Sequence, residues 1–275
     1  MTPIVVKFGG ELLDAPAHLQ TIVSAMSMAT RRSTPLIIVH GGGRKIDAAL
    51  EAAGITKQQV DGLRVTDEAT LEVVVAVLVG IVNTRLVAAL VTSGVPAVGL
   101  SGADARCGLS ERAPAHHTVD GRTVDLGHVG VPADHTDVRL FETLLNDGFL
   151  PVVASIGVDR SGQLLNVNAD TFAAHVAAQV GARRLVIAGA TAGVLSDGGV
   201  TIPLLEPSTI ATLVSSGTAT AGMIAKLRAC AHALAHGVND VVIIDGRDGA
   251  AIATAVSGEV PAAATLLAGE TVNTR

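Results

Sequence analysis

The chain of 275 residues is 49% hydrophobic and 16% charged, which supplies a large buried core and excludes a disordered chain. It has no Trp or Tyr, four Phe and a net charge of −6. Nucleic-acid binders stack bases on aromatic side chains and meet phosphates with a basic surface, so we expect no nucleic-acid partner.

Six short runs rich in valine and isoleucine predict buried strands, because parallel strands covered on both faces are almost continuously apolar. In chain order they are Ile4–Phe8, Leu36–Val39, Ala97–Leu100, Val152–Ser155, Leu185–Ala188 and Val241–Ile244. Helix-like segments alternate with them at about 17–31, 44–53, 67–93, 137–147, 169–180, 208–215 and 223–236. This alternation predicts an α/β fold, a three-layer α/β/α sandwich around a mainly parallel sheet.

The segment from Asp67 to Ser93 predicts a helix that is apolar on almost every side, with Thr66 as its cap. A helix without a polar face is buried on two sides, either inside the subunit or against a second copy. We expect a homodimer formed through residues 67–93. The longest apolar run, Val73 to Val82, is shorter than the roughly 20 residues that a membrane helix needs, so we expect no membrane partner.

The polar segment 103–130 predicts an excursion at one rim of the sheet, with a β-hairpin on the Asp120-Gly121 turn. We interpret its histidines and carboxylates as hairpin residues and expect no metal site. Cys107 and Cys230 form no CxxC pair, and no basic segment followed by a long apolar one opens the chain. These features predict a cytoplasmic protein without disulfides.

Two glycine-rich turns follow strands. Lys7 precedes Gly9 and Gly10, where backbone N–H groups can approach a phosphate while the lysine supplies charge. His40 precedes Gly41, Gly42 and Gly43, which open a helix. This second turn suits either an anion site made of free helix amides or an esterase oxyanion hole. The anion site is favoured, because the chain has no G-x-S-x-G nucleophile elbow.

Further polar residues complete the candidate site. Arg64 can hold a carboxylate with two parallel hydrogen bonds. Asn166 and Asn168 are two residues apart in an extended stretch and point to the same side. Lys226 lies in the first turn of a helix, where a positive charge opposes the helix dipole and therefore indicates a function. Neither a P-loop nor a G-x-G-x-x-G fingerprint occurs, so any ATP site uses another scaffold.

In this order the motifs resemble those of the N-acetylglutamate kinases of the amino acid kinase family, over most of the chain. They are Val5–Gly10, Ile38–Gly43, Gly62–Thr66, Leu126–Gly130, Asn166–Asp170, Gly222–Lys226 and Val242–Arg247. The resemblance implies a single domain, 1–275, with a sheet of about eight strands. Its N-terminal lobe, about 1–180, would bind the acyl amino acid and form the dimer, and its C-terminal lobe, about 181–275, would bind ATP.

The reaction implied is transfer of the γ-phosphoryl group of ATP to the side-chain carboxylate of N-acetyl-L-glutamate in arginine biosynthesis, with Mg²⁺ held mainly by the nucleotide phosphates. Such an acceptor is already ionised at neutral pH, so no general base is required. By the same resemblance the catalytic residues are Lys7, Lys226 and Asp170. The substrate-binding residues are Gly41, Gly42, Arg64, Asn166 and Asn168, and the phosphate or nucleotide contacts are Gly9, Gly10, Gly43, Gly193, Gly222 and Met223.

Three departures from the family pattern are visible. Ala190 stands where an Asp is usual, Ala221 precedes Gly222 where Asp or Gly is frequent, and Ala262–Thr265 replaces a Gly-Thr ending. The first two leave open a non-catalytic amino-acid sensor of the same fold. A sister kinase acting on another acyl or carrier-linked carboxylate also stays open, although Asn166–Asp170 favours acetylglutamate. Lacking the N-terminal helix of hexameric members, the chain is expected to be insensitive to arginine.

Overall fold

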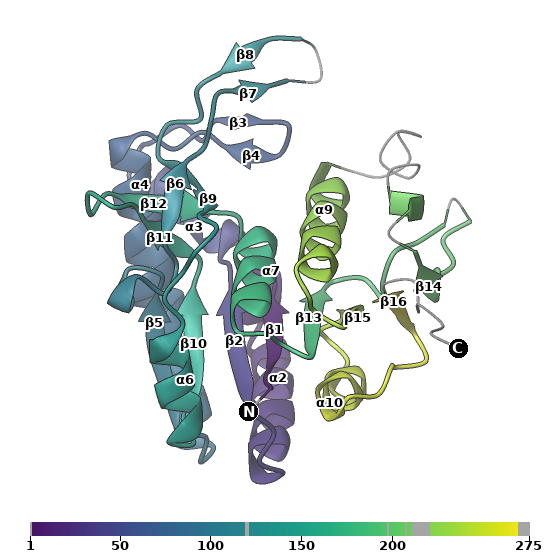
Figure 1. The fold of residues 1–275 in the computed structure, drawn as a ribbon. Coiled ribbons are helices and arrows are strands. Elements are labelled where there is room, and N and C mark those ends of the chain that lie inside the picture. Colours follow the sequence, from purple (N-terminus) through teal and green to yellow (C-terminus); the bar gives the residue numbers. More distant parts are fainter. Residues whose placement is uncertain (1, 119–120, 197, 207, 211–220, 269–275) are drawn as a thin grey trace.

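A computed structural model describes residues 2–118, 121–196, 198–206, 208–210 and 221–268 (Figure 1). Its main sheet has eight strands in the order β14-β16-β15-β13-β1-β2-β10-β5. Their bounds are β1 Ile4–Phe8, β2 Leu36–His40, β5 Ala97–Ser101, β10 Leu150–Ala154, β13 Arg184–Gly189, β14 Leu204–Leu205, β15 Asp240–Asp245 and β16 Ala264–Ala268. The family resemblance implied about eight strands in a mainly parallel sheet, and this is confirmed.

Strand β1 lies at the centre of this sheet. It pairs in parallel with β2 on one side and β13 on the other, so that Lys7 lies opposite Val39 and Ile187. The carboxyl ends of these three strands therefore meet at one edge of the sheet. Strands β16 and β14 are the exceptions, because β16 runs antiparallel to β15 and β14 pairs in parallel with β16.

Helices cover both faces of the sheet, because alternate residues of each buried strand point to opposite faces. Ile4, Val6 and Phe8 enter one apolar core and Val5 enters the other. The first core is covered by α1 Gly10–Asp14, α2 Pro16–Arg31, α3 Gly43–Ala52 and α10 Gly249–Ser257, together with the long helix 68–92. The second is covered by α6 Arg139–Asn146, α7 Ala169–Gln179 and α9 Ala221–Ala235.

The long predicted helix is confirmed, with α4 Glu68–Val75, a π-helical segment η1 Ala76–Asn83 and α5 Thr84–Thr92. Asp67 rather than Thr66 caps it, because the Asp67 carboxylate accepts from the Thr70 amide at 2.8 Å. Residues 68–92 are apolar and long enough to cross a membrane, but Val74, Leu78 and Leu86 pack into the core. Within one chain the opposite face stays open, with Ile81 41% and Val91 52% exposed.

A smaller four-stranded sheet, in the order β11-β12-β9-β6, lies beside the cavity edge. Its strands are β6 Ser110–Arg112, β9 Val129–Pro132, β11 Ile156–Val158 and β12 Leu164–Val167. Two hairpins stand above it in Figure 1, namely β3 Gln59–Val60 with β4 Leu63–Arg64, and β7 His116–His117 with β8 Thr123–Val124. The predicted rim hairpin is thus confirmed in its strand pairing, while Asp120 lies outside the described residues.

The sequence patterns missed β14, β16, α10 and the smaller sheet. Helix α10 and strand β16 are Ala-rich and nearly all apolar, so neither shows the period of its element. The strands of the smaller sheet are three or four residues long and mixed in polarity. Of the predicted helix 208–215, residues 208–210 are helical and the rest lies outside the described residues.

Candidate active site

A cavity of about 550 Å³ opens at the carboxyl ends of β1 and β2. It is lined by both glycine turns, the β4 hairpin, the end of β12 and the first turn of α7. Ten of the residues predicted from sequence line it, namely Lys7, Gly9, Gly10, Gly41, Gly42, Gly43, Arg64, Asn166, Asn168 and Asp170. Residues that are far apart in sequence therefore meet at one place.

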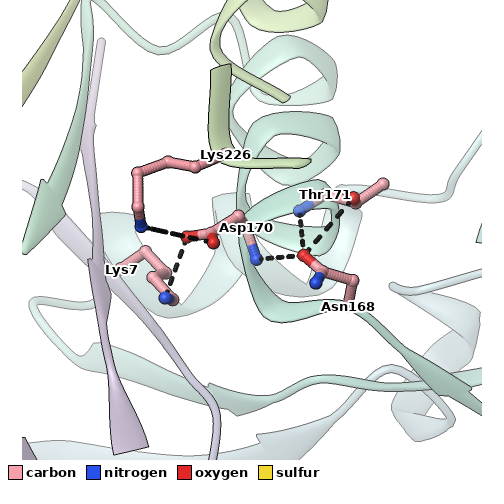
Figure 2. Close-up of polar contacts among 5 residues, drawn as sticks. All are labelled: Lys7, Asn168, Asp170, Thr171 and Lys226. Atoms are coloured by element: carbon pink, nitrogen blue, oxygen red, sulfur yellow. Dashed lines mark hydrogen bonds and ion pairs between the residues drawn. The ribbon is translucent and has the colours of Figure 1, made fainter. Parts of the chain in front are cut away.

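Two lysines share one carboxylate beside this cavity (Figure 2). Lys7 comes from the end of β1 and lies 2.8 Å from Asp170 Oδ1, in the first turn of α7. Lys226 lies in the second turn of α9 and not in the first as predicted, because the helix begins at Ala221, and its ammonium group is 3.3 Å from both carboxylate oxygens of Asp170. Helices α7 and α9 pack side by side, which brings the second lysine to the first.

All three side chains are nearly closed off from water, with 10% of Lys7, 11% of Asp170 and 14% of Lys226 exposed. Burial alone would raise the pKa of Asp170, but the charges of Lys7 and Lys226 lower it to about 2. Burial and the nearby charge of Lys7 lower the pKa of Lys226, against the attraction of Asp170. Two cations against one anion leave one positive charge in excess, which a bound anion would neutralise.

The two glycine turns touch each other. A Cβ on Gly10 would lie 2.6 Å from the Cα of Gly42, so any side chain there would force the turns apart. Gly42 also precedes α3 and packs against Leu78 of η1. The N–H groups of Gly9 and Gly41 donate to the carbonyls of Ala188 and Phe8, so close approach of a ligand to the turn amides stays a prediction for Gly10, Gly42 and Gly43.

The asparagines act in different ways. Asn168 is the N-cap of α7, where its Oδ1 accepts from the amides of Asp170 at 2.9 Å and Thr171 at 3.1 Å (Figure 2). It thereby fixes the turn that presents Asp170. Asn166 on β12 donates to Thr66 Oγ1 at 3.1 Å, and Thr66 in turn donates to the carbonyl of Arg64. Thr66 is fully buried and connects the asparagine to the arginine.

Arg64 is held beside the cavity by an ion pair between its Nη2 and Asp47, which also binds Lys57 at 2.7 Å. Burial opposes ionisation of Asp47, yet the hydrogen bonds from Lys57 and Arg64 lower its pKa. The other terminal nitrogen of Arg64, Nη1, is buried and has no hydrogen-bond partner among the described residues. A donor without a partner in a cavity wall is suited to a carboxylate ligand.

The remaining predicted residues lie outside the lining of this cavity. Gly193 follows β13 with a φ of +114°, and a Cβ there would meet Thr265 Oγ1 at 2.4 Å. Gly222 is exposed at the start of α9, and Met223 packs against the second core. Ala190, the first departure from the family pattern, is exposed at the end of β13. Of the predicted phosphate or nucleotide contacts, the cavity lining thus includes Gly9, Gly10 and Gly43 and leaves out the three from the later part of the chain.

Sequence analysis missed several polar residues of the site. Thr66 was interpreted only as a cap, and its hydroxyl became recognisable only when β12 came beside it. His116 and His117 line the cavity, and His116 Nε2 lies 2.8 Å from Asp61 Oδ2, which joins the two hairpins. Among the described residues no group of three His, Cys, Asp or Glu side chains is arranged to hold a metal ion.

A family model described as the amino acid kinase family matches residues 2–245. The acetylglutamate kinase of Novosphingobium aromaticivorans is 39% identical over 252 residues, which covers 88% of this chain and 83% of that protein. The acetylglutamate kinase of Methanopyrus kandleri is 40% identical and covers 87% of this chain and 93% of that protein.

Solved structures agree in fold. The protein smu.665 from Streptococcus mutans UA159 superposes with a TM-score of 0.79 at 27% identity, covering 96% of this chain and 98% of that one. The carbamate kinase of Giardia lamblia bound to AMP-PNP has a TM-score of 0.70 at 14% identity, with 98% and 99% covered. At 14% identity, the similarity to the carbamate kinase shows a shared fold and no more.

Proposed function

Because the chain belongs to the amino acid kinase family and its relatives include acetylglutamate kinases, we propose that it phosphorylates the side-chain carboxylate of N-acetyl-L-glutamate with ATP. The product would be N-acetyl-L-glutamyl 5-phosphate, an intermediate of arginine biosynthesis. The observation that carries the proposal is the buried set of Lys7, Asp170 and Lys226 beside a cavity that also contains an unpaired arginine nitrogen.

The reacting group of the acceptor is a carboxylate, with an ordinary pKa of about 4, so it is already a nucleophile at neutral pH. The protein then has two tasks, which are to align the acceptor with the phosphoryl group and to neutralise charge as it spreads over the transferring oxygens. Lys7 and Lys226 supply that charge, and Asp170 holds both ammonium groups in place. Because the site excludes most water, their effect is larger than in solution.

On the acceptor side, Arg64 directs its unpaired Nη1 to the carboxylate of N-acetyl-L-glutamate that does not react. Gly42 would present its backbone N–H group and Gly41 its backbone surface, because the Gly41 N–H donates to the carbonyl of Phe8 at 3.4 Å, while Asn166 and Asn168 also line the cavity. The side-chain amide of Asn166 also donates to Thr66 Oγ1, and this hydrogen bond fixes the orientation of the Asn166 side chain.

The residues present fit a nucleotide polyphosphate. The glycine turns touch where side chains would block a phosphate, and one positive charge is in excess beside them. ATP supplies the phosphoryl group, and Mg²⁺ bound to its phosphates reduces their charge. Gly9, Gly10 and Gly43 would line the phosphate path, and Gly193, Gly222 and Met223 would lie on the nucleotide side. That assignment makes residues 1–180 the acceptor lobe and 181–275 the nucleotide lobe of one domain.

We further propose a homodimer through the exposed face of helix 68–92. Ile81 and Val91 are the large apolar side chains of that face, and strand β5 leaves an open sheet edge beside them. Sedimentation of the intact protein and of Ile81→Asp would separate dimer from monomer.

The two cysteines are unpaired and buried, in keeping with the reducing cytoplasm, where cell fractionation should find the protein.

The reaction is tested by incubating the purified protein with MgATP and acceptor and trapping acyl phosphate with hydroxylamine. We expect hydroxamate from N-acetyl-L-glutamate and little from N-succinylglutamate, free glutamate or aspartate. Arg139→Ala is the matched control, because Arg139 lies outside the cavity lining and 86% of its side chain is exposed. If only a different acceptor gave hydroxamate, that acceptor would be the substrate in place of N-acetyl-L-glutamate. If no acceptor gave hydroxamate, the result would favour a non-catalytic amino-acid sensor.

A further inference from the structure

Asn83, the last residue of the π-helical segment η1, is a buried polar residue behind the glycine turn. Only 4% of its surface is exposed. Its side-chain amide donates to the carbonyl of Val152 at 2.8 Å and contacts His40 Nε2 at 2.9 Å. Since a carbonyl can only accept, the nitrogen of the amide faces Val152, and its second N–H is directed at His40 Nε2 at 2.9 Å, which is nearer than the carbonyl of Leu100 at 3.5 Å.

This contact fixes the form of the histidine. His40 Nε2 accepts from Asn83, so the ring proton lies on Nδ1, which donates to the carbonyl of Gly41 at 3.2 Å. His40 is fully buried, and burial lowers its pKa to about 4 despite the hydrogen bond to Gly41. The imidazole is therefore neutral at physiological pH. It accepts from the helix at Nε2 and donates to the turn at Nδ1.

A second contact joins the same helical segment to the same turn. Leu78 and Val82 of η1 lie where a Cβ on Gly42 would be, at 2.8 and 3.3 Å. On the far side, a Cβ on Gly99 would lie 2.3 Å from Asn83 Oδ1, so the glycine of β5 provides the space for the amide. The π-helical geometry shifts the register of the helix by one residue. The segment thus contacts the turn in two ways. Leu78 and Val82 pack at Gly42, and Asn83 is linked to the carbonyl of Gly41 through hydrogen bonds at both nitrogens of His40.

We propose that Asn83 is a positioning residue for the acceptor. It holds His40 in a single tautomer, and His40 holds the carbonyl of Gly41, whose N–H is bound to the carbonyl of Phe8, so that the amides of Gly42 and Gly43 face the cavity. The proposal rests on the proposed function only in naming N-acetyl-L-glutamate as the molecule that these amides receive. Asn83 itself does not line the cavity.

Steady-state kinetics of Asn83→Leu separates positioning from a purely structural role. Displacing catalytic or binding groups by a fraction of an ångström is costly, so we expect KM for N-acetyl-L-glutamate to rise about tenfold or more, with KM for ATP within about twofold. Leu90→Ala is the control, because Leu90 is fully buried in the same helix but lies two turns away from the contact. It should lower thermal stability and leave both KM values unchanged.

Asn83→Asp keeps the side-chain volume and gives a second test if Asn83→Leu does not fold. A carboxylate beside His40 Nε2 favours the doubly protonated ring. Nitrogen-15 NMR of the histidines, with His40 assigned through His40→Gln, should therefore report the Nδ1–H form in the unsubstituted protein and imidazolium in Asn83→Asp. The KM for the acceptor should rise together with that change.

Two results would overturn the proposal: an Nε2–H tautomer of His40 in the unsubstituted protein, or an altered ring in Asn83→Asp with an unchanged KM for the acceptor. Absence of turnover in the unsubstituted protein would instead contradict the proposed function. The tautomer measurement needs no substrate and keeps the two failures distinct.

Discussion

The two sides of the site are built from different kinds of groups. On the acceptor side, side chains from distant elements are linked, with Asn166 bound to Thr66, Thr66 to the backbone of Arg64, and Arg64 to Asp47. At the positions assigned to the nucleotide, the described residues offer the glycine backbone of Gly193 and Gly222 and the apolar side chain of Met223. The polar group there, Thr265 Oγ1, is turned inward to Val194 N and Ile202 O.

This difference indicates how each substrate is selected. An acceptor defined by its carboxylates is held by charges in fixed positions, so its recognition depends on individual side chains. A nucleotide held by backbone groups depends on the shape of turns, and single side chains contribute less. Substitutions on the acceptor side should therefore change activity most, and those at the nucleotide positions should act mainly through local folding.

The largest effect is expected from Lys226→Ala. Removing one preorganised charge from the transition state typically costs about 10²- to 10³-fold in kcat. KM for N-acetyl-L-glutamate should change little, because Lys226 lies outside the acceptor lining. Rapid-quench kinetics would measure it, with Lys226→Arg as the charge-retaining control. A variant that raised KM and kept kcat would place Lys226 in binding rather than catalysis.

Arg64→Lys comes next. The charge is kept but the planar fork of the guanidinium is lost, and with it the nitrogen Nη1 that has no described partner. A charged hydrogen bond is worth about 1.5 to 3 kcal/mol, so KM for the acceptor should rise by roughly tenfold to a hundredfold. Isothermal titration calorimetry with the acceptor would measure the corresponding loss of binding affinity. An equal loss of ATP affinity would contradict the division between the two sides.

The pair of lysines also predicts a pH dependence of stability. The pKa of Asp170 falls from its ordinary 3.8 to about 2 in the folded chain, which corresponds to about 2 kcal/mol of stability. Since the folded pKa is depressed, this stability is present above about pH 4 and is lost as the pH falls toward about 2. Urea unfolding at several pH values would measure the loss, which Asp170→Asn should abolish.

Asp137 is the matched control for this acid loss. Its pKa is also lowered to about 2, by hydrogen bonds from Arg139, but the pair is on the surface, with 86% of the Arg139 side chain exposed. Exposed ion pairs contribute little because water screens them. Asp137→Asn should therefore leave the acid profile unchanged. If it removed the loss as Asp170→Asn does, burial would not be the reason for the effect.

The smallest effect is expected at the nucleotide positions. Thr265→Val would leave Val194 N and Ile202 O without their shared partner, which costs about 1 to 3 kcal/mol of unfolding free energy. We expect a change of no more than a few fold in KM for ATP and none in KM for the acceptor. Thermal unfolding would measure the loss of stability, and steady-state kinetics would measure the two KM values. A loss of acceptor affinity would contradict the division between the acceptor side and the nucleotide positions.

The sequence predicted the strands and helices of the sheet because buried parallel strands such as Ile4–Phe8 are continuous apolar runs. It also predicted the residues that meet at the cavity, since Lys7, the glycines and Arg64 lie in short motifs. It could not predict Thr66, Asn83 or the Asp61–His116 pair, because these depend on segments brought together by folding. It also could not decide whether the second face of helix 68–92 is covered inside the subunit or by a second copy, because periodicity cannot say what covers an apolar surface, and the homodimer stays a prediction.

The pH dependence of the single-turnover rate tests the central claim most directly, which is that charge neutralisation without a general base drives phosphoryl transfer. With saturating MgATP and N-acetyl-L-glutamate, the rate should be level from roughly pH 6 to pH 8, because the acceptor carboxylate is ionised throughout that range. A rate that rises with one ionisation near the ordinary histidine pKa of about 6.5 would contradict the account and indicate a base at the site.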